Sequence, residues 1–296
     1  MPEQTAGRAT SGADDAELRA LLHECTATRS LAHGTLTPIT GGLSNRAWRL
    51  DACGAAWFVR LGHPDAARLG VDRRSECVAL RAVSAAGLAP AVRACEPDLG
   101  LLVTRYIDGT TWRAADVAVQ SNLQRVAERL RCLHGLPVPT GVQVVNYAQQ
   151  ARHLEAGLTA ADSEAAALQV RAGHVFERLA GRGIAKTLCH HDLHHLNLVD
   201  DGARLWLVDW EYAGRGDPLL DVAGFLAMHR LGPAPTAEFL KRYGRLRAAD
   251  RVCLDDARWA FDYVQWLWYR SRFPDPAQDE ARHAEGLAQR LLRCNN

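Results

Sequence analysis

Lysine is almost absent from this chain of 296 residues. Of its 35 lysine and arginine side chains, only Lys186 and Lys241 are lysines. An excess of charge of either sign is also missing, since the net charge is +1. No overall field therefore draws the chain to nucleic acid or to an anionic membrane. No apolar run is long enough to span a bilayer. We expect neither a nucleic-acid nor a membrane partner for this globular protein.

Several familiar signatures are missing as well. The first eight residues contain no apolar signal-peptide core, and the eight cysteines form no C-x-x-C pair. We therefore expect a cytoplasmic protein whose cysteines are reduced and mostly buried. The chain also has no G-x-x-x-x-G-K-[ST] sequence and no G-x-G-x-x-G between a strand and a helix. These absences exclude a P-loop NTPase and leave a dinucleotide-binding fold unsupported.

The order of strand-like and helical segments predicts two lobes. Strand-like runs lie at 35–40, 46–51, 55–61, 91–95 and 101–107, and one helix interrupts them at 72–86. Helical spacing then dominates, at 121–133, 148–158, 164–179, 219–230, 237–247, 255–270 and 280–292, with short strands at 186–189, 196–199 and 205–208. The pattern predicts an α+β fold with a disordered lead (1–13), a small β-rich lobe (14–107) and a large helical lobe (108–296).

The clearest chemical motif is His190-x-Asp192-x-x-x-x-Asn197, followed twelve residues later by Asp209 at the end of an apolar strand. Phosphoryl transfer from ATP needs a carboxylate that accepts or orients the proton of the attacking hydroxyl group. It also needs oxygen ligands that hold Mg²⁺ against the phosphates. Asp192 suits the first role, and Asn197 and Asp209 suit the second. A strand-loop-strand arrangement would bring all three to one end of a small hairpin.

Ordinary structural explanations stay open for these residues. Asp192 could cap a loop, and Asp209 could belong to a turn. The neighbouring histidines could instead form a metal cluster; they are His190, His191, His194 and His195. Adjacent histidines without a cysteine partner match the usual spacing of zinc ligands poorly, so the metal cluster is the less favoured interpretation.

Two further segments, Ile39–Arg46 and Val208–Asp217, complete a set that resembles the aminoglycoside phosphotransferase and choline kinase group of small-molecule kinases. Within that group the chain is most similar to bacterial choline and thiamine kinases, from about residue 35 to about residue 275. The resemblance implies a bilobal protein-kinase-like fold that uses ATP and Mg²⁺. It also implies that His190 supports the catalytic loop and that Asp221 ties a helix to it.

A short run of small and polar residues between the first two strands is a candidate phosphate-binding loop. Small residues allow backbone N–H groups to approach phosphate oxygens closely, although two glycines between strands are also typical of a plain hairpin. The position of this run ahead of the strand at 55–61 favours the phosphate-binding interpretation. The residues expected to contact nucleotide here are Gly41, Gly42, Leu43, Ser44 and Asn45.

The near absence of lysine limits which cation can grip the phosphates. The resemblance implies a cation on the third strand that pairs with a glutamate of the following helix. Arg60, which ends that strand, is then the only sensible candidate, and Glu76 is its expected partner. The alternative is an exposed surface pair. The resemblance also implies that the strand at 101–107 leads into the hinge between the lobes. Backbone groups of Arg105 and Ile107 would then read the adenine edge.

The last long helix but one is crowded with aromatic residues. By i+3 and i+4 spacing a single face carries Trp259, Tyr263, Trp266 and Tyr269, with Asp262 beside it. Such a stripe is as often core as a binding surface. It occurs, however, where similar choline and thiamine kinases bind the positive charge of their substrate, and aromatic faces attract quaternary cations. Trp210 and Glu211 could line the same cleft.

Three functions are therefore compared. The favoured one is an ATP-dependent kinase of a small cationic alcohol, such as choline, ethanolamine or thiamine. A second is an aminoglycoside or sugar phosphotransferase of the same fold. A third, a nucleotide-binding pseudokinase, finds no support because Asp192, Asn197 and Asp209 are all present. The sequence leaves open the exact substrate, the oligomeric state (a homodimer included), the choice between ATP and GTP and the number of Mg²⁺ ions.

Overall fold

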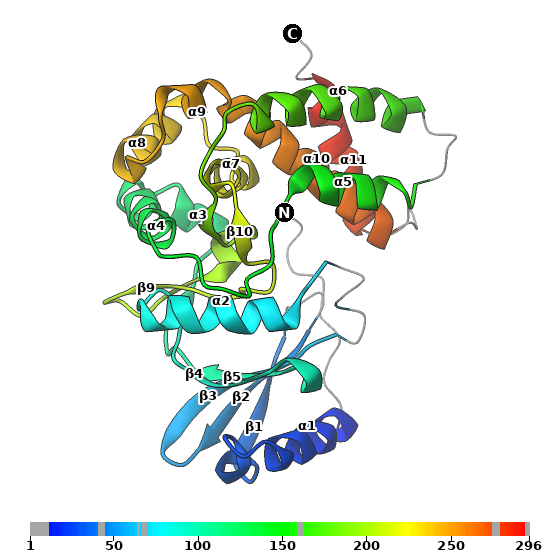
Figure 1. The fold of residues 1–296 in the computed structure, drawn as a ribbon. Coiled ribbons are helices and arrows are strands. Elements are labelled where there is room, and N and C mark those ends of the chain that lie inside the picture. Colours follow the sequence, from blue (N-terminus) through cyan, green and yellow to red (C-terminus); the bar gives the residue numbers. More distant parts are fainter. Residues whose placement is uncertain are drawn as a thin grey trace.

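The computed structural model describes residues 12–40, 45–63, 66, 70–158, 163–273 and 279–293. A small lobe with an antiparallel sheet lies below a larger helical lobe in Figure 1. This mixture of one small sheet and many helices confirms the predicted α+β fold class. Within the described part of the chain, no helix combines the length and the apolar character that crossing a membrane requires.

The sheet of the small lobe has the order β1-β2-β3-β5-β4, and all neighbouring strands are antiparallel. Its strands are β1 (Thr35–Ile39), β2 (Arg46–Ala52), β3 (Ala55–Leu61), β4 (Val92–Glu96) and β5 (Leu101–Arg105). The tight turn between β2 and β3 has positive φ at Cys53 (53°) and Gly54 (70°), as a two-residue hairpin turn requires. The longer connection from β3 to β4 contains helix α2 (Arg73–Ala85).

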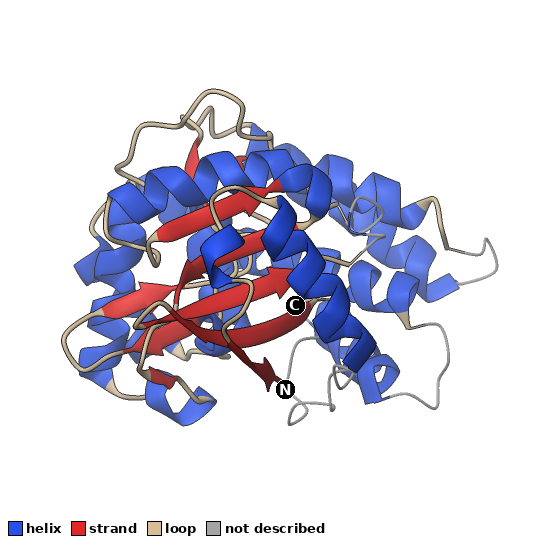
Figure 2. Cartoon of the chain, turned by 90° about the horizontal axis from the view of Figure 1, so that it is seen from below, coloured by secondary structure: helices blue, strands red, loops and turns tan. Residues whose placement is uncertain are grey.

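Each face of this sheet has its own core. Helix α1 (Gly12–Glu24) covers one face, where Leu18 and Leu22 pack with Trp48 and Leu50 of β2, and it lies in front of the strands in Figure 2. Helix α2 covers the other face and belongs to the core that continues into the helical lobe. Of the predicted disordered lead, residues 1–11 lie outside the described residues, and the next two are helical.

The helical lobe is built around one central helix. Its helices are α3 (Ala114–Val117), α4 (Gln120–Leu133), α5 (Tyr147–Glu155), α6 (Ser163–Ala180), α7 (Pro218–Met228), α8 (Pro233–Tyr243), α9 (Ala248–Val252), α10 (Leu254–Arg272) and α11 (Asp279–Arg293). Its strands are β6 (Thr110–Thr111), β7 (Thr187–Cys189), β8 (Leu198–Asp200), β9 (Leu205–Leu207) and β10 (Gly214–Gly216). Helix α10 packs against α5, α6, α7 and α11, so neighbours surround most of its circumference.

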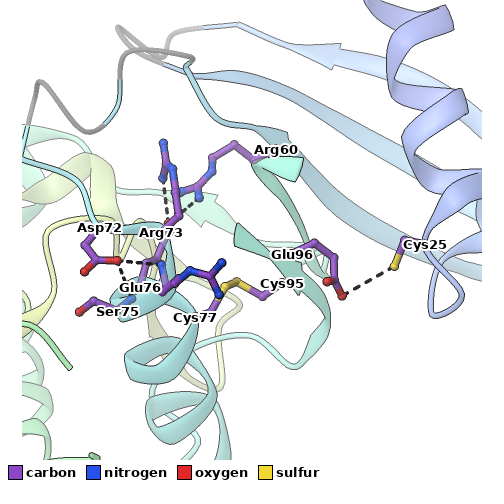
Figure 3. Close-up of a disulfide and its surroundings, with 10 residues drawn as sticks. Cys25, Arg60, Asp72, Arg73, Ser75, Glu76, Cys77, Cys95 and Glu96 are labelled. Carbon is purple, nitrogen blue, oxygen red and sulfur yellow. Dashed lines mark hydrogen bonds and ion pairs between the residues drawn. A yellow bond between two sulfur atoms is a disulfide. The ribbon is translucent and has the colours of Figure 1, made fainter. Parts of the chain in front are cut away.

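The expectation of reduced cysteines is wrong for one pair. Cys77 of α2 and Cys95 of β4 form a disulfide, with their Cα atoms 5.7 Å apart (Figure 3). The two residues are 18 positions apart in the sequence, and only the packing of α2 on the sheet brings them together. The expectation of burial also fails for Cys53 and Cys132, whose thiols are free and whose side chains are exposed.

We expect reduction of this disulfide to destabilise the small lobe. Releasing a loop of 18 residues restores chain entropy to the unfolded state, which corresponds to roughly 3 kcal/mol of lost stability. Denaturant titrations of Cys77→Ser and of the wild type should show this loss, and Cys132→Ser, which removes an exposed thiol, is the control. Equal thiol counts in unfolded protein before and after treatment with a reductant would contradict the disulfide.

Candidate active site

The catalytic motif forms a tightly hydrogen-bonded loop between β7 and β8. The Nδ2 atom of Asn197 donates to the backbone oxygen of Asp192 at 2.8 Å and lies 3.5 Å from its carboxylate. The imidazole of His190 donates from Nε2 to the carbonyl of Val208 (3.0 Å), and its Nδ1 accepts the N–H of Asp192 (3.3 Å). His190 therefore joins the loop to the end of β9 and acts as a support, as the sequence indicates.

Asp221 of α7 anchors the same loop through its backbone N–H groups. Its carboxylate accepts the backbone N–H groups of His190 (2.7 Å) and His191 (2.6 Å), as well as the imidazole Nε2 of His134 (3.0 Å). The pKa of Asp221 lies well below its usual range because these hydrogen bonds and the nearby histidines outweigh its burial. A buried carboxylate that remains ionised in this way holds the backbone of the loop in place without taking part in the chemistry.

Asp209 ends the β9 segment with a positive φ of 61°, a conformation that few residues other than glycine adopt. Its side chain is 41% exposed, so the carboxylate is open to the cleft between the lobes. Val208, which precedes it, donates its N–H to the carbonyl of Asn197 at 3.0 Å. Nδ2 of Asn197 is committed to Asp192, and Asn197 lines the same cleft as Asp209. An amide oxygen and a carboxylate fit the preference of Mg²⁺ for oxygen ligands.

Burial and neighbouring negative charges raise the pKa values of Asp192 and Asp209. Partial burial, followed by the negative charges of Asp209 and Glu211, raises the pKa of Asp192 above its usual range. Partial burial and the Glu211 carboxylate likewise raise the pKa of Asp209, although Arg60 acts in the opposite direction. A raised pKa makes Asp192 a better proton acceptor near neutral pH than an ordinary carboxylate. The excess of negative charge also favours a bound cation.

The predicted ion pair between Arg60 and Glu76 is present and buried. Nη2 of Arg60 donates to Oε2 of Glu76 at 2.8 Å, and Nη1 lies 2.7 Å from Oε1, so a hydrogen bond and a second close charge contact join the pair. The two side chains are only 5% and 1% exposed, which excludes the alternative of a solvent-exposed surface pair. Nη1 of Arg60 also lies 3.7 Å from the carboxylate of Asp209. The pair therefore joins β3 and α2 at the edge of the acidic cluster.

The other residues predicted to contact nucleotide are placed as follows. Gly41, Gly42, Leu43 and Ser44 lie outside the described residues. Asn45, which follows them, donates from Nδ2 to the Glu211 carboxylate at 2.8 Å. Arg105 and Ile107 both line the cleft. The N–H of Arg105 donates to the carbonyl of Ala91 at 2.7 Å.

A cleft of about 880 Å³ runs between the lobes and contains Asp192, Asn197 and Asp209. Its aromatic lining comes from Phe58, Tyr106, Tyr147, Trp210, Tyr212, Trp268 and Tyr269. Its amide-bearing and imidazole lining includes Gln143, Asn146, Gln149, Gln150, His153 and Gln265. Of the residues that the sequence analysis assigned to substrate, Trp210, Glu211 and Tyr269 are thus found at the cleft.

The structure revises the predicted aromatic face of α10. Trp259, Tyr263 and Trp266 are buried in the core and are not among the described residues that line the cleft. Trp259 donates from Nε1 to the carbonyl of Leu291 in α11 (3.2 Å), and the hydroxyl group of Tyr263 donates to Glu155 in α5 (2.6 Å). Asp262 also faces α11, with its carboxylate 3.3 Å from Nε of Arg290. These residues fasten α10 to its neighbours, which is the structural role left open above.

Trp210 and Glu211 line the cleft, as the sequence analysis suggests, and the structure adds the partners of their side chains. The Trp210 side chain is buried, donates from Nε1 to Leu207 (3.0 Å) and packs on the ring of His190. Glu211 bonds to Asn45 and Arg73 rather than to the aromatic residues of α10. The sequence analysis missed Tyr212 and Trp268. Trp268 lies three residues after Gln265 and four after Val264, so the three share one face of α10, and all three line the cleft. This helical spacing is the sequence signal that could have indicated Trp268.

A two-lobed fold, a loop carrying Asp192 and Asn197, and a buried arginine–glutamate pair across a shared cleft together define a kinase-like phosphotransferase. The chain belongs to the phosphotransferase enzyme family, whose model matches residues 35–257.

Individual relatives agree with this assignment. Protein LicA of Haemophilus influenzae is 28% identical over 210 residues, which are 69% of this chain and 61% of that protein. The match thus spans less than two thirds of the relative. A choline/ethanolamine kinase family protein from Mesorhizobium loti has a TM-score of 0.77 and 25% identity, covering 94% of this chain and 93% of that one. Choline kinase LicA from Streptococcus pneumoniae shares the fold, with a TM-score of 0.77, 17% identity and coverages of 93% and 98%.

Proposed function

We propose that this protein transfers the γ-phosphoryl group of ATP to the hydroxyl group of a small cationic alcohol, with choline, ethanolamine and thiamine as the first choices. The observation that carries the proposal is the cleft, where Asp192 shares one space with acidic and aromatic side chains. Carboxylates and aromatic faces both attract a cation. The names of the Mesorhizobium and Streptococcus proteins support the same substrate class.

In this mechanism Asp192 accepts the proton of the substrate hydroxyl group as its oxygen attacks the phosphorus atom. Asn197 donates to the backbone around Asp192, and His190 and Asp221 accept its N–H groups, so the Asp192 carboxylate meets the hydroxyl group in a fixed position. Asn197 and Asp209 would hold Mg²⁺. The bound ion would neutralise charge on the transferring phosphoryl group.

The nucleotide would bind between the small lobe (14–107) and the catalytic and substrate-binding lobe (108–296). Arg60, kept in place by Glu76, provides the positive charge for the phosphates. The carbonyl of Arg105 and the backbone of Ile107 read the adenine edge, and residues 41–44 with Asn45 cover the phosphates. The cation of the alcohol lies on the far side of Asp192, toward Tyr212, Trp268 and Tyr269.

We expect Trp268→Ala and Tyr269→Ala to raise KM for the alcohol about 5- to 30-fold and to leave KM for ATP almost unchanged. Removal of one aromatic wall of a cation site costs about 1–2 kcal/mol. Trp266→Ala, in the same helix but in the core, is the matched control. It should cost about 3–5 kcal/mol of stability instead. Steady-state kinetics and thermal melting of the three variants separate the two effects, and unchanged KM values for both cleft variants would contradict the cation site.

The proposal as a whole is tested by ADP release from purified protein in a coupled assay. The panel contains choline, ethanolamine, thiamine, amino sugars and kanamycin, each with ATP and Mg²⁺. The proposal predicts a higher kcat/KM for one of the three cationic alcohols than for the sugars or the antibiotic. Turnover with kanamycin alone would contradict the substrate class while leaving the kinase assignment intact.

A further inference from the structure

Arg73, the first residue of α2, connects three segments that lie far apart in the sequence. Its Nη1 donates to Oε2 of Glu76 at 2.8 Å and to Oε2 of Glu211 at 3.1 Å. Its Nη2 donates to Oδ1 of Asn45 at 3.0 Å. Figure 3 shows Arg73 and Arg60 both directed toward Glu76 from different elements. One guanidinium thus contacts both carboxylates and the residue that follows 41–44.

The contacts around Arg73 close into a ring. Asn45 accepts from Arg73 through Oδ1 and donates through Nδ2 to the same Glu211 oxygen that Arg73 contacts, at 2.8 Å. Asn45 belongs to the small lobe, whereas Glu211 follows Asp209 in the helical lobe, 166 positions further along the chain. Each of the three side chains in this ring therefore bonds to the other two. The ring bridges the lobes at the end of the cleft where Arg60 and Asp209 lie.

The side chains of this ring are buried, so losing one of them should have a larger effect than losing one partner of an exposed ion pair. The side chains of Glu211 and Arg73 are 7% and 12% exposed. A carboxylate this buried requires a charged or strongly hydrogen-bonding partner. Nη1 of Arg60 lies 2.7 Å from Glu76 but approaches Glu211 only to 3.9 Å. Arg73 is therefore the nearer cation for Glu211.

We propose that Arg73 is a positioning residue that holds the nucleotide site together across the two lobes. It fixes Glu76, and through it Arg60, relative to Asn45 and to the segment that carries Asp209. Contacts that hold these groups in one arrangement lower the cost of ordering them when MgATP binds. The inference rests on the proposed nucleotide site and adds to it a residue without contact to the reacting atoms. Arginine suits the role because its planar guanidinium group can donate hydrogen bonds to several acceptors at once.

The test compares Arg73→Ala, Arg73→Lys and Arg74→Ala. Arg74 is the matched control because it is the next residue of α2 but forms an exposed pair with Asp98. We expect Arg73→Ala to raise the Kd of MgATP, measured by calorimetry, and KM for ATP by roughly tenfold or more, as loss of charged hydrogen bonds implies. The value of kcat should stay within about twofold, since no group on the reacting atoms changes. Arg73→Lys should fall between, and Arg74→Ala should match the wild type.

A second measurement uses the nucleotide-free protein. Amide hydrogen exchange at residues 73–76 and 46–52 should become faster in Arg73→Ala and stay unchanged in Arg74→Ala, because the ring no longer ties these segments to the helical lobe. Wild-type and Arg73→Ala proteins with equal MgATP affinity and equal exchange would overturn the inference. Wild-type protein that binds no MgATP would instead overturn the proposed nucleotide site, a result that calorimetry on the wild type shows by itself.

Discussion

The Asp192→Asn variant is expected to lose phosphoryl transfer by roughly 10²- to 10⁴-fold, the usual contribution of a catalytic base. The amide of asparagine has nearly the same shape as the carboxylate but cannot accept the hydroxyl proton. The backbone contacts of the loop stay intact, because Asn197 bonds to the carbonyl of residue 192 and Asp221 bonds to the two preceding N–H groups. Rapid-quench measurement of a single turnover gives the size of the loss.

Nucleotide affinity separates this result from misfolding. MgATP should bind to Asp192→Asn within a few-fold of the wild-type affinity, and the melting temperature should change little. Asp255→Asn, at a side chain that is 95% exposed, is the control for removal of a carboxylate from the helical lobe. A loss of turnover smaller than tenfold in Asp192→Asn would show that another group accepts the proton.

The Asp209→Ala variant is expected to lose the part of nucleotide binding that depends on Mg²⁺. Asp209 lies two residues after β9, and its side chain is exposed. Its carboxylate oxygens could therefore take the place of water molecules that coordinate Mg²⁺. Calorimetry should therefore give the variant the same affinity for ATP with Mg²⁺ as with a chelator, whereas the wild type should bind MgATP much more tightly than free ATP.

The control for Asp209 is Asp255→Ala, which removes an exposed carboxylate far along the chain from the cleft motif. It should retain the full Mg²⁺ effect. If Asp209→Ala kept the wild-type difference between MgATP and free ATP, the metal would have to be held by other residues, and the assignment of Asn197 would fall with it.

Local motifs explain what could be predicted from the sequence. His190, Asp192 and Asn197 lie within eight residues, so their spacing alone is enough to place them in one loop. The Arg60–Glu76 pair was predicted from the resemblance, which implies a cation on the third strand paired with a helix glutamate, and Arg60 was the candidate because the small lobe has no lysine. In both cases the residues that must meet lie close together in the sequence.

Contacts between distant segments explain what could not be predicted. Residues 73 and 211 are 138 positions apart, and their ion pair depends on how the lobes meet. The Cys77–Cys95 disulfide depends on the packing of α2 against β4.

Helix α10 shows a related limit. Periodicity places Trp259, Tyr263 and Trp266 on one face, but only the positions of α5, α6 and α11 decide that this face is covered. The boundaries of α8 were misplaced for a local reason. The helix begins at Pro233, where a missing N–H costs nothing in the first turn, rather than at the predicted residue 237.

Direct detection of the phosphorylated alcohol tests the central claim most directly. Purified protein is incubated with ATP, Mg²⁺ and choline, ethanolamine or thiamine, and the products are followed by ³¹P NMR and mass spectrometry, with Asp192→Asn as the blank. The account predicts one new phosphate monoester, heavier than the alcohol by one HPO₃ unit, with loss of one γ-phosphate per molecule formed and none in the blank. Loss of γ-phosphate only to water, or equal product from Asp192→Asn, would contradict it.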